Sequence, residues 1–87
     1  MPAALPGQTL VTAPQLGQLL VASRKRRKLT QSDVAQRVGL SQNRISYLEK
    51  NPDDISFKQL LSWCSAIGLE LRLGERDVVE SRNISEW

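Results

Sequence analysis

Apolar side chains recur at helical spacing in four stretches of the chain. The first stretch begins after Thr12, which together with Gln15 makes the Thr-x-x-Gln pattern of a capping box. Pro14 falls inside the first turn, where its missing N–H costs nothing. The apolar stripe that follows consists of Leu16, Leu19 and Leu20. The pattern predicts a helix that runs to about Lys28, with a basic end that suits the negative pole of the helix dipole.

Two short helices joined by a tight turn are predicted next. Thr30 is an expected N-cap for a helix over residues 31–38, and Gly39 ends it because glycine accepts a positive φ. Ser41 is an expected N-cap for a third helix that extends to about Lys50. The apolar positions expected to face inward are Val34, Ala35, Val38, Leu40, Ile45 and Leu48. Pro52 disfavours helical geometry at Asn51, so residues 51–54 are predicted to form a loop.

A fourth helix is predicted between Ser56, its N-cap, and Gly68, where it ends. Its expected apolar stripe consists of Phe57, Leu60, Leu61, Cys64 and Ile67. Trp63 lies off this stripe, so it either supports a dimer interface or covers the edge of the core. Few aromatic and many aliphatic residues also favour a compact helical core over a β-sandwich.

Residues 69–73 alternate apolar and charged side chains, which is the period of a half-buried strand. The rest of the chain offers no second strand, and a lone strand leaves its N–H and C=O groups unpaired. We therefore expect it to pair with its own copy across a two-fold axis, through Leu69, Leu71 and Leu73. A core of this size is marginal, which also favours a homodimer. The alternative is a monomer with a frayed C-terminal extension.

The two ends of the chain lack a sustained period. Residues 1–11 contain two prolines and a glycine and are expected to be a flexible lead-in. Residues 74–87 are polar and are expected to be a disordered tail. One domain is therefore predicted over residues 12–73.

Charge is unevenly placed along the chain. The net charge is +3, yet residues 24–50 hold eight basic and two acidic side chains, a net of +6. This imbalance favours a polyanionic partner. The single Cys64 excludes an intramolecular disulfide, and the absence of histidine excludes a Cys/His metal cluster. With no paired carboxylates and no phosphate loop, we expect a non-enzymatic cytoplasmic protein without cofactor, metal, small-molecule ligand or membrane span.

The segment from Thr30 to Glu49 has the features of two helices that cross steeply through a tight turn. Ala35 is small where the helices approach, and Gly39 supplies the turn. From Leu29 to Glu49 the chain resembles the Xre/Cro/lambda-repressor family, whose pattern is L-T-Q-x-x-[LV]-A-x-x-x-G-[LIV]-S-x-x-x-[IV]-S-x-[LIWF]-E. The resemblance implies a compact all-α fold of four to five packed helices. It also implies that the helix over 41–50 inserts into the major groove of double-stranded DNA.

With Ile45 and Leu48 turned inward, the polar side of this helix is left for DNA. The expected base readers are Gln42, Asn43, Ser46 and Tyr47. Glutamine and asparagine can each form two hydrogen bonds with adenine in the major groove. The alternative is that Gln42 and Asn43 are ordinary polar surface residues with no role in DNA binding. The expected phosphate contacts are Gln31, Ser32, Ser41, Arg44, Lys50 and Lys28. The resemblance further implies that Arg24 pairs with Glu49.

The order of features after this motif resembles the HipB group of antitoxins within that family. These features are Asn51-Pro52-Asp53, a fourth helix, the alternating segment 69–73 and a terminal Glu86-Trp87. The resemblance implies a homodimeric autorepressor on an inverted-repeat operator, with a HipA-like kinase toxin as partner and Trp87 as the toxin-binding anchor. The N-terminal lead-in is longer than in the HipB group, and the residues at the start of the third helix differ from those of that group. The operator sequence of that group can therefore not be assigned to this protein.

Two other functions remain open. The first is an Xre-family repressor, of phage or restriction-controller type, without a toxin partner. The second is an interaction adaptor that has lost DNA binding, which the polar face of the third helix argues against. Trp87 could equally be an unstructured end or a degradation signal.

Overall fold

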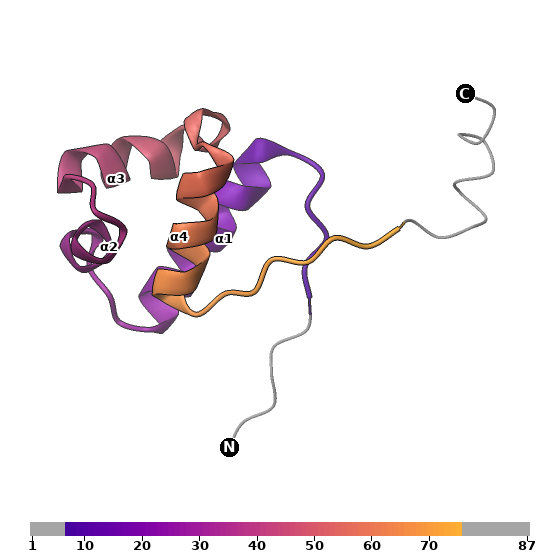
Figure 1. The fold of residues 1–87 in the computed structure, drawn as a ribbon, viewed down its shortest axis with the longest axis horizontal. Coiled ribbons are helices and arrows are strands. Elements are labelled where there is room, and N and C mark those ends of the chain that lie inside the picture. The colour runs from indigo at the N-terminus through magenta and orange to yellow at the C-terminus, as the bar shows by residue number, and fades with distance from the viewer. Residues whose placement is uncertain (1–6, 76–87) are drawn as a thin grey trace, which may run out of the picture.

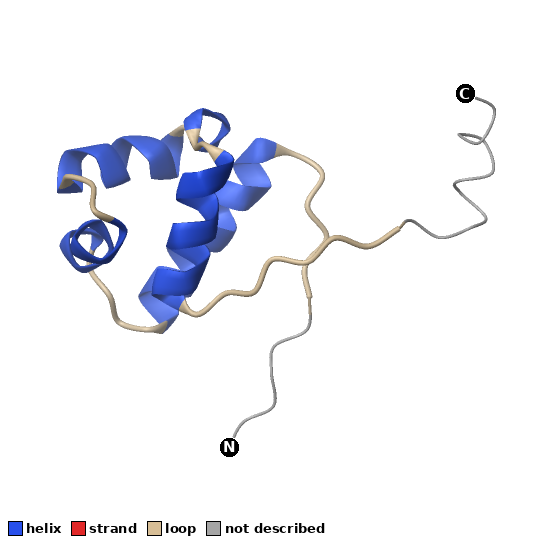
Figure 2. Ribbon diagram, viewed as in Figure 1, coloured by secondary structure: helices blue, strands red, loops and turns tan. Residues whose placement is uncertain are grey.

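The computed structural model describes residues 7–75, which form a helical domain without a strand in that range. Its elements in chain order are α1 (Ala13–Arg26), α2 (Gln31–Val38), α3 (Gln42–Lys50), the short 3-10 turn η1 (Pro52–Asp54) and α4 (Phe57–Ile67). In Figure 1, α4 lies beside α1, while α2 and α3 pack on one side of that pair. The predicted all-α architecture is confirmed for these residues (Figure 2).

All four helices begin where side-chain caps are predicted. Thr12, Thr30 and Ser56 each form a capping box, with Gln15, Asp33 and Gln59 as the respective partners. The hydroxyl oxygen of Ser41 accepts a hydrogen bond from the backbone N–H of Arg44 at 3.0 Å. These contacts satisfy N–H groups that the first turn of a helix leaves without a partner. They involve residues three apart, so the residue types at those positions are enough to predict them.

The helix ends agree with prediction at three of four places, including Lys50 at the end of α3. Gly39 and Gly68 both adopt the left-handed conformation, with φ of 85° and 76°. The first helix, in contrast, ends at Arg26 and not at Lys28. Lys28 has a φ of 60°, and the backbone N–H of Leu29 turns back to the carbonyl oxygen of Arg24 at 3.0 Å. A lysine therefore takes the left-handed position that glycine occupies at the ends of α2 and α4.

The core lies where all four helices meet. Its buried members are Leu20, Val34, Ala35, Ile45, Leu48, Trp63 and Ile67. Half-buried residues surround them, including Leu16, Val38, Leu40 and Leu60. Every inward position predicted for α2 and α3 is therefore in the core or packed against it.

The buried face of α4 differs from the predicted stripe. Trp63 is fully buried within the single chain, while Phe57 and Leu61 are 67% and 46% exposed. Two overlapping stripes were possible on this helix, and the one that contains the indole faces inward. Burial of the larger apolar surface explains the choice, since an indole has more area to remove from water than a leucine. Trp63 is therefore a core residue, which corrects the expectation that it supports a dimer interface.

The segment after α4 forms no ladder within the single chain. Residues 69–75 are irregular, and the backbone N–H of Leu69 closes the helix end by donating to the carbonyl of Cys64 at 2.8 Å. Leu71 and Leu73 are 37% and 98% exposed. A strand needs a neighbouring strand for its hydrogen bonds, and residues 7–75 of one chain supply none. Pairing with a second copy stays a prediction.

The predicted loop at 51–54 is more ordered than expected. Residues Pro52–Asp54 form η1, and Pro52 is buried against α1. Among the helices of residues 7–75, none combines the length and the apolar run needed to cross a membrane.

Candidate nucleic-acid interface

The two sides of α3 differ sharply in exposure. Ile45 and Leu48 are completely buried, which fixes one side of the helix against the core. The other side presents polar groups: Gln42, Asn43, Arg44 and Lys50 are exposed, and Ser46 is half-buried. Figure 1 shows α3 along one edge of the molecule. The helix therefore offers a polar ridge that a groove of DNA could receive.

The turn between α2 and α3 sets the angle of this ridge. Gly39 and Leu40 both donate backbone hydrogen bonds to the carbonyl of Ala35, at 2.8 and 3.0 Å. Ala35 is 5% exposed, so the helices approach closely over its methyl group. The expected roles of Ala35 and Gly39 in a helix-turn-helix are both confirmed.

A buried ion pair holds α3 to α1. The guanidinium of Arg24 donates from Nε to Oε2 of Glu49 at 2.7 Å, and from Nη2 to Oε1 at 3.2 Å. Both residues are 8% exposed. A third nitrogen of Arg24 donates to the carbonyl of Leu29 at 3.0 Å. The predicted pairing of Arg24 with Glu49 is confirmed, and its two-point geometry fixes the orientation of α3.

Gln31 belongs to the same network. Its amide nitrogen donates to Oε1 of Glu49 at 2.9 Å, so α1, α2 and α3 meet at a single carboxylate. The phosphate contact predicted for Gln31 would have to coexist with this bond or replace it. Ser32 and Ser41 are exposed near the starts of α2 and α3, and Lys28 is exposed in the turn before α2. Arg44 and Lys50 are exposed on α3 itself, so a phosphate could reach each of these side chains except the half-buried Gln31 without a change in the fold.

Tyr47 differs from the other predicted base readers. Its hydroxyl donates to Oδ2 of Asp54 in η1 at 2.5 Å, and the Arg44 guanidinium lies 5.3 Å from the centre of its ring. The hydrogen bond to the Asp54 carboxylate raises the pKa of the Tyr47 phenol, because loss of the proton would put two negative charges together. The Tyr47 hydroxyl is thus bonded within the protein, whereas the side chains of Gln42 and Asn43 form no hydrogen bond within residues 7–75.

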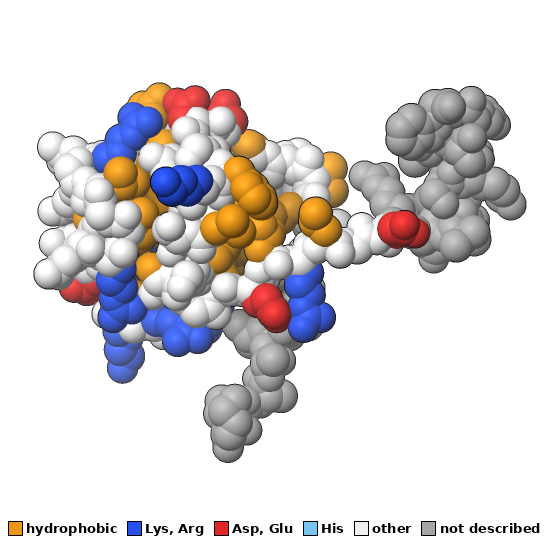
Figure 3. Space-filling model, in the orientation of Figure 1, with side chains coloured by type: hydrophobic (Ala, Val, Ile, Leu, Met, Phe, Trp, Pro, Cys, Tyr) orange, Lys and Arg blue, Asp and Glu red, His pale blue; other side chains and the backbone are white. Residues whose placement is uncertain are grey.

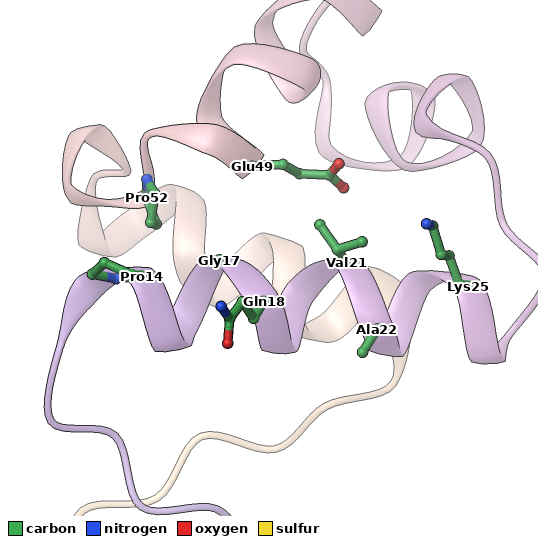
Figure 4. Close-up of a pocket in the computed structure, with 8 residues that line it drawn as sticks. All are labelled: Pro14, Gly17, Gln18, Val21, Ala22, Lys25, Glu49 and Pro52. Carbon is green, nitrogen blue, oxygen red and sulfur yellow. The ribbon is translucent and has the colours of Figure 1, made fainter.

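A shallow groove runs beside the ion pair, between α1 and the end of α3. Figure 4 shows Glu49 reaching over α1, while Gln18 and Ala22 point away from α3. Gly17 lies at the closest approach: a Cβ there would stand 2.8 Å from the carbonyl oxygen of Glu49 and 3.1 Å from Cγ of Pro52. The groove is therefore the seam of a tight helix contact, and it lies off the polar ridge.

Three residues that shape the interface were missed from sequence. Gly17 had a signal, since a lone glycine within a helical pattern often marks a close packing contact. Asp54 and Asn51 had none, because their contacts to Tyr47 depend on the conformation of the turn between α3 and α4. Trp87 and most of the predicted tail lie outside the described residues.

The comparisons with known proteins agree with this geometry. Residues 20–73 match the family model described as helix-turn-helix. Antitoxin HigA1 of Mycobacterium tuberculosis, found in two strains, is 35% identical over 75 residues, which cover 86% of this chain and 50% of HigA1. The chain thus spans about half the length of these curated relatives.

Solved structures give the same result at the level of the fold. A chain in the HipA–HipB–O2–O3 complex matches with a TM-score of 0.74 and 25% identity, over 82% of this chain and 100% of that chain. A chain in the HipB–O1–O2 complex matches with a TM-score of 0.72 and 26% identity, over 79% and 100%. The present chain therefore belongs to the helix-turn-helix family, of Xre type, and is similar to the HigA and HipB antitoxins.

Proposed function

We propose that this chain is the DNA-binding antitoxin of a toxin–antitoxin pair. As a homodimer it reads an inverted-repeat operator, represses its own operon and neutralises a HipA-like kinase toxin. The observation that carries the proposal is the division of α3 into a buried apolar side and an exposed polar side. A helix of this kind is what a helix-turn-helix protein places in the major groove.

The proposed contacts divide into two kinds. Gln42, Asn43 and Ser46 lie on the N-terminal half of α3 and read base edges. The groups that contact phosphates are Ser32, Ser41, Arg44, Lys50 and Lys28, with Gln31 at the start of α2. Phosphate contacts fix the position of the protein on the duplex, and base contacts supply sequence preference.

A Gln42→Ala variant tests the base-reading assignment. It should weaken binding to the DNA that precedes the gene by about 5- to 150-fold, and leave binding to random DNA nearly unchanged. Gln18→Ala is the matched control, since it removes the same group from the face of α1 that points away from α3 (Figure 4). Fluorescence anisotropy with labelled duplexes measures both. Equal losses on both duplexes would contradict a base-reading role for Gln42.

The homodimer is supported by apolar side chains left exposed in the single chain. Phe57 and Leu61 lie on α4, where Figure 3 shows a hydrophobic patch, and Leu71 and Leu73 follow in the irregular segment. Two copies paired through residues 69–73 would satisfy that backbone and place two α3 helices on half-sites one helical turn, or a multiple, apart.

Sedimentation tests the dimer. The full chain should sediment as a dimer, and a Leu71→Asp/Leu73→Asp variant should sediment as a monomer with unchanged helix content. A dimer that survives the double substitution would exclude residues 69–73 as its interface.

The toxin partner is supported by similarity to a chain in a complex that contains HipA, and by relatives that are themselves named antitoxins. A HipA-like kinase encoded beside the gene should bind the chain, and Trp87→Ala should weaken this binding if the terminal indole is an anchor. Isothermal titration of kinase into each variant measures the affinity. Operator binding without kinase binding would make the chain a repressor of the same family with no toxin of this type.

A further inference from the structure

Three side chains form a connected row from α3 to the turn that follows it. Tyr47 lies one turn beyond Arg44 on α3, and the Arg44 guanidinium stands over its ring, 5.3 Å from the ring centre. The phenol of Tyr47 donates to the carboxylate of Asp54. The row therefore runs from Arg44 through Tyr47 to Asp54, and its last member belongs to η1.

The Asp54 end of the row is held firmly. The Asp54 backbone N–H donates to the carbonyl of Asn51 at 3.0 Å, and the Asn51 amide donates to the carbonyl of Tyr47 at 2.9 Å. Pro52, in the same turn, is buried against α1. The ring of Tyr47 is thus fixed at its hydroxyl by a turn that is itself anchored to the core.

The Arg44 end of the row is available to bind an anion. Within residues 7–75, the Arg44 guanidinium has no ion pair and no hydrogen bond, and the residue is exposed. A guanidinium held over an aromatic ring by cation–π attraction still has N–H groups that can donate to another acceptor. An arginine held in this way has less rotamer freedom to lose on binding than one in open solvent.

The acidic residues of η1 indicate which end of the row a DNA phosphate would approach. Asp53 and Asp54 are exposed beside the C-terminal end of α3, where they repel phosphate. The hydroxyl of Tyr47 points to this acidic end and is already bonded there. Arg44, one turn nearer the helix start, is exposed in the first turn of α3 together with Gln42 and Asn43.

We propose that Tyr47 is a positioning residue that holds the Arg44 guanidinium in place for a DNA phosphate, with Asp54 fixing the tyrosine. This inference rests on the proposed DNA-binding function, and it replaces the base-reading role predicted for Tyr47. It predicts that Tyr47 affects DNA binding only through Arg44.

The test measures binding to a random-sequence duplex of roughly 20 base pairs, enough for two half-sites one turn apart, by anisotropy at several salt concentrations. Arg44→Ala should lower the salt slope by about one unit, as expected for one lost phosphate contact. Tyr47→Ala should weaken binding about two- to fivefold in the wild-type background. Tyr47→Phe keeps the ring over which Arg44 lies but removes the hydroxyl that binds Asp54, so its affinity should fall between those of the wild type and Tyr47→Ala.

Double variants separate positioning from direct contact. In the Arg44→Ala background, Tyr47→Ala should cause no further loss, because its only route to the DNA is already removed. In the Lys50→Ala background, which removes a different cation of α3, the loss caused by Tyr47→Ala should keep its full size. Melting curves from circular dichroism show that each variant is folded, and Tyr47→Phe decides the matter if Tyr47→Ala lowers the melting temperature.

The results that overturn the inference are distinct from those that overturn the proposed function. If Tyr47→Ala weakens binding fully even without Arg44, then Tyr47 contacts DNA itself. If Arg44→Ala weakens binding and Tyr47→Ala does not, the ring has no positioning role. In both cases DNA binding stands. If the wild-type protein shows no salt-dependent binding to any duplex, the proposed function fails and the inference fails with it.

Discussion

The ion pair between Arg24 and Glu49 gives the sharpest test of how α3 is held in place. Glu49→Ala removes the carboxylate and leaves the Arg24 guanidinium, in a residue that is 8% exposed, with the Leu29 carbonyl as its one remaining partner among residues 7–75. The variant also leaves the amide of Gln31 without its acceptor. Breaking one side of a buried ion pair costs about 3–5 kcal/mol, since the remaining charge has lost its solvation without compensation. A domain of this size has about 3–10 kcal/mol in total. Glu49→Ala should therefore be close to unfolding at room temperature.

Urea unfolding followed by far-ultraviolet circular dichroism measures the free energy of unfolding for each variant. Glu70→Ala is the matched control, because it breaks a second glutamate–arginine pair, Glu70 with Arg72, whose side chains are 75% and 81% exposed. An exposed pair contributes at most about 1 kcal/mol. The Arg24→Met/Glu49→Leu double variant should recover most of the loss, since apolar side chains of similar volume can replace a buried pair.

Two results would refute this reasoning. A loss for Glu49→Ala no larger than that for Glu70→Ala would mean that water reaches the pair and that its burial does not decide its energy. A double variant as unstable as Glu49→Ala would mean that the uncompensated Arg24 charge is not the cause of the loss.

Three further predictions follow from single contacts. Gly17→Ala should destabilise the fold by about 1–3 kcal/mol in urea unfolding, because the added Cβ would stand 2.8 Å from the Glu49 carbonyl oxygen; a gain near the usual helical value of about 1 kcal/mol would show that α1 can move aside. Hydrogen bonds from Thr30 lower the pKa of Asp33, and the bond from its backbone has a larger effect than that from its side chain. The ionised carboxylate therefore stabilises the fold at a pH above its pKa in the unfolded chain, and this stabilisation is lost as the pH falls through its lower pKa in the folded protein. When the pH is lowered from neutral to acid, the free energy of unfolding should therefore fall less for Asp33→Asn than for the wild type. An equal fall would contradict a stabilising role for the Asp33 carboxylate in the cap. Burial raises the pKa of the Cys64 thiol, so a thiol reagent at neutral pH should modify it far more slowly in the native protein than in urea, and equal rates would show that the thiol is accessible.

The sequence alone determined where the helices begin and which pair forms the helix-turn-helix. The caps at Thr12, Thr30, Ser41 and Ser56 join residues three apart, and the left-handed ends of α2 and α4 fall on Gly39 and Gly68. Because such contacts are local, a pattern of residue types specifies them. The buried pair Arg24–Glu49 was also expected, although from the family resemblance and not from any local pattern.

Only the tertiary structure decided which face of α4 is buried. Either of two stripes satisfies the helical period, and the position of the Trp63 indole among three other helices selects one of them. Hydrophobic burial has no direction of its own, so the outcome depends on which surfaces meet and how much apolar area each arrangement removes from water. The same dependence explains the close contact at Gly17, the bond from Tyr47 to Asp54, and the lack of a partner strand for Leu71 within the described part of one chain.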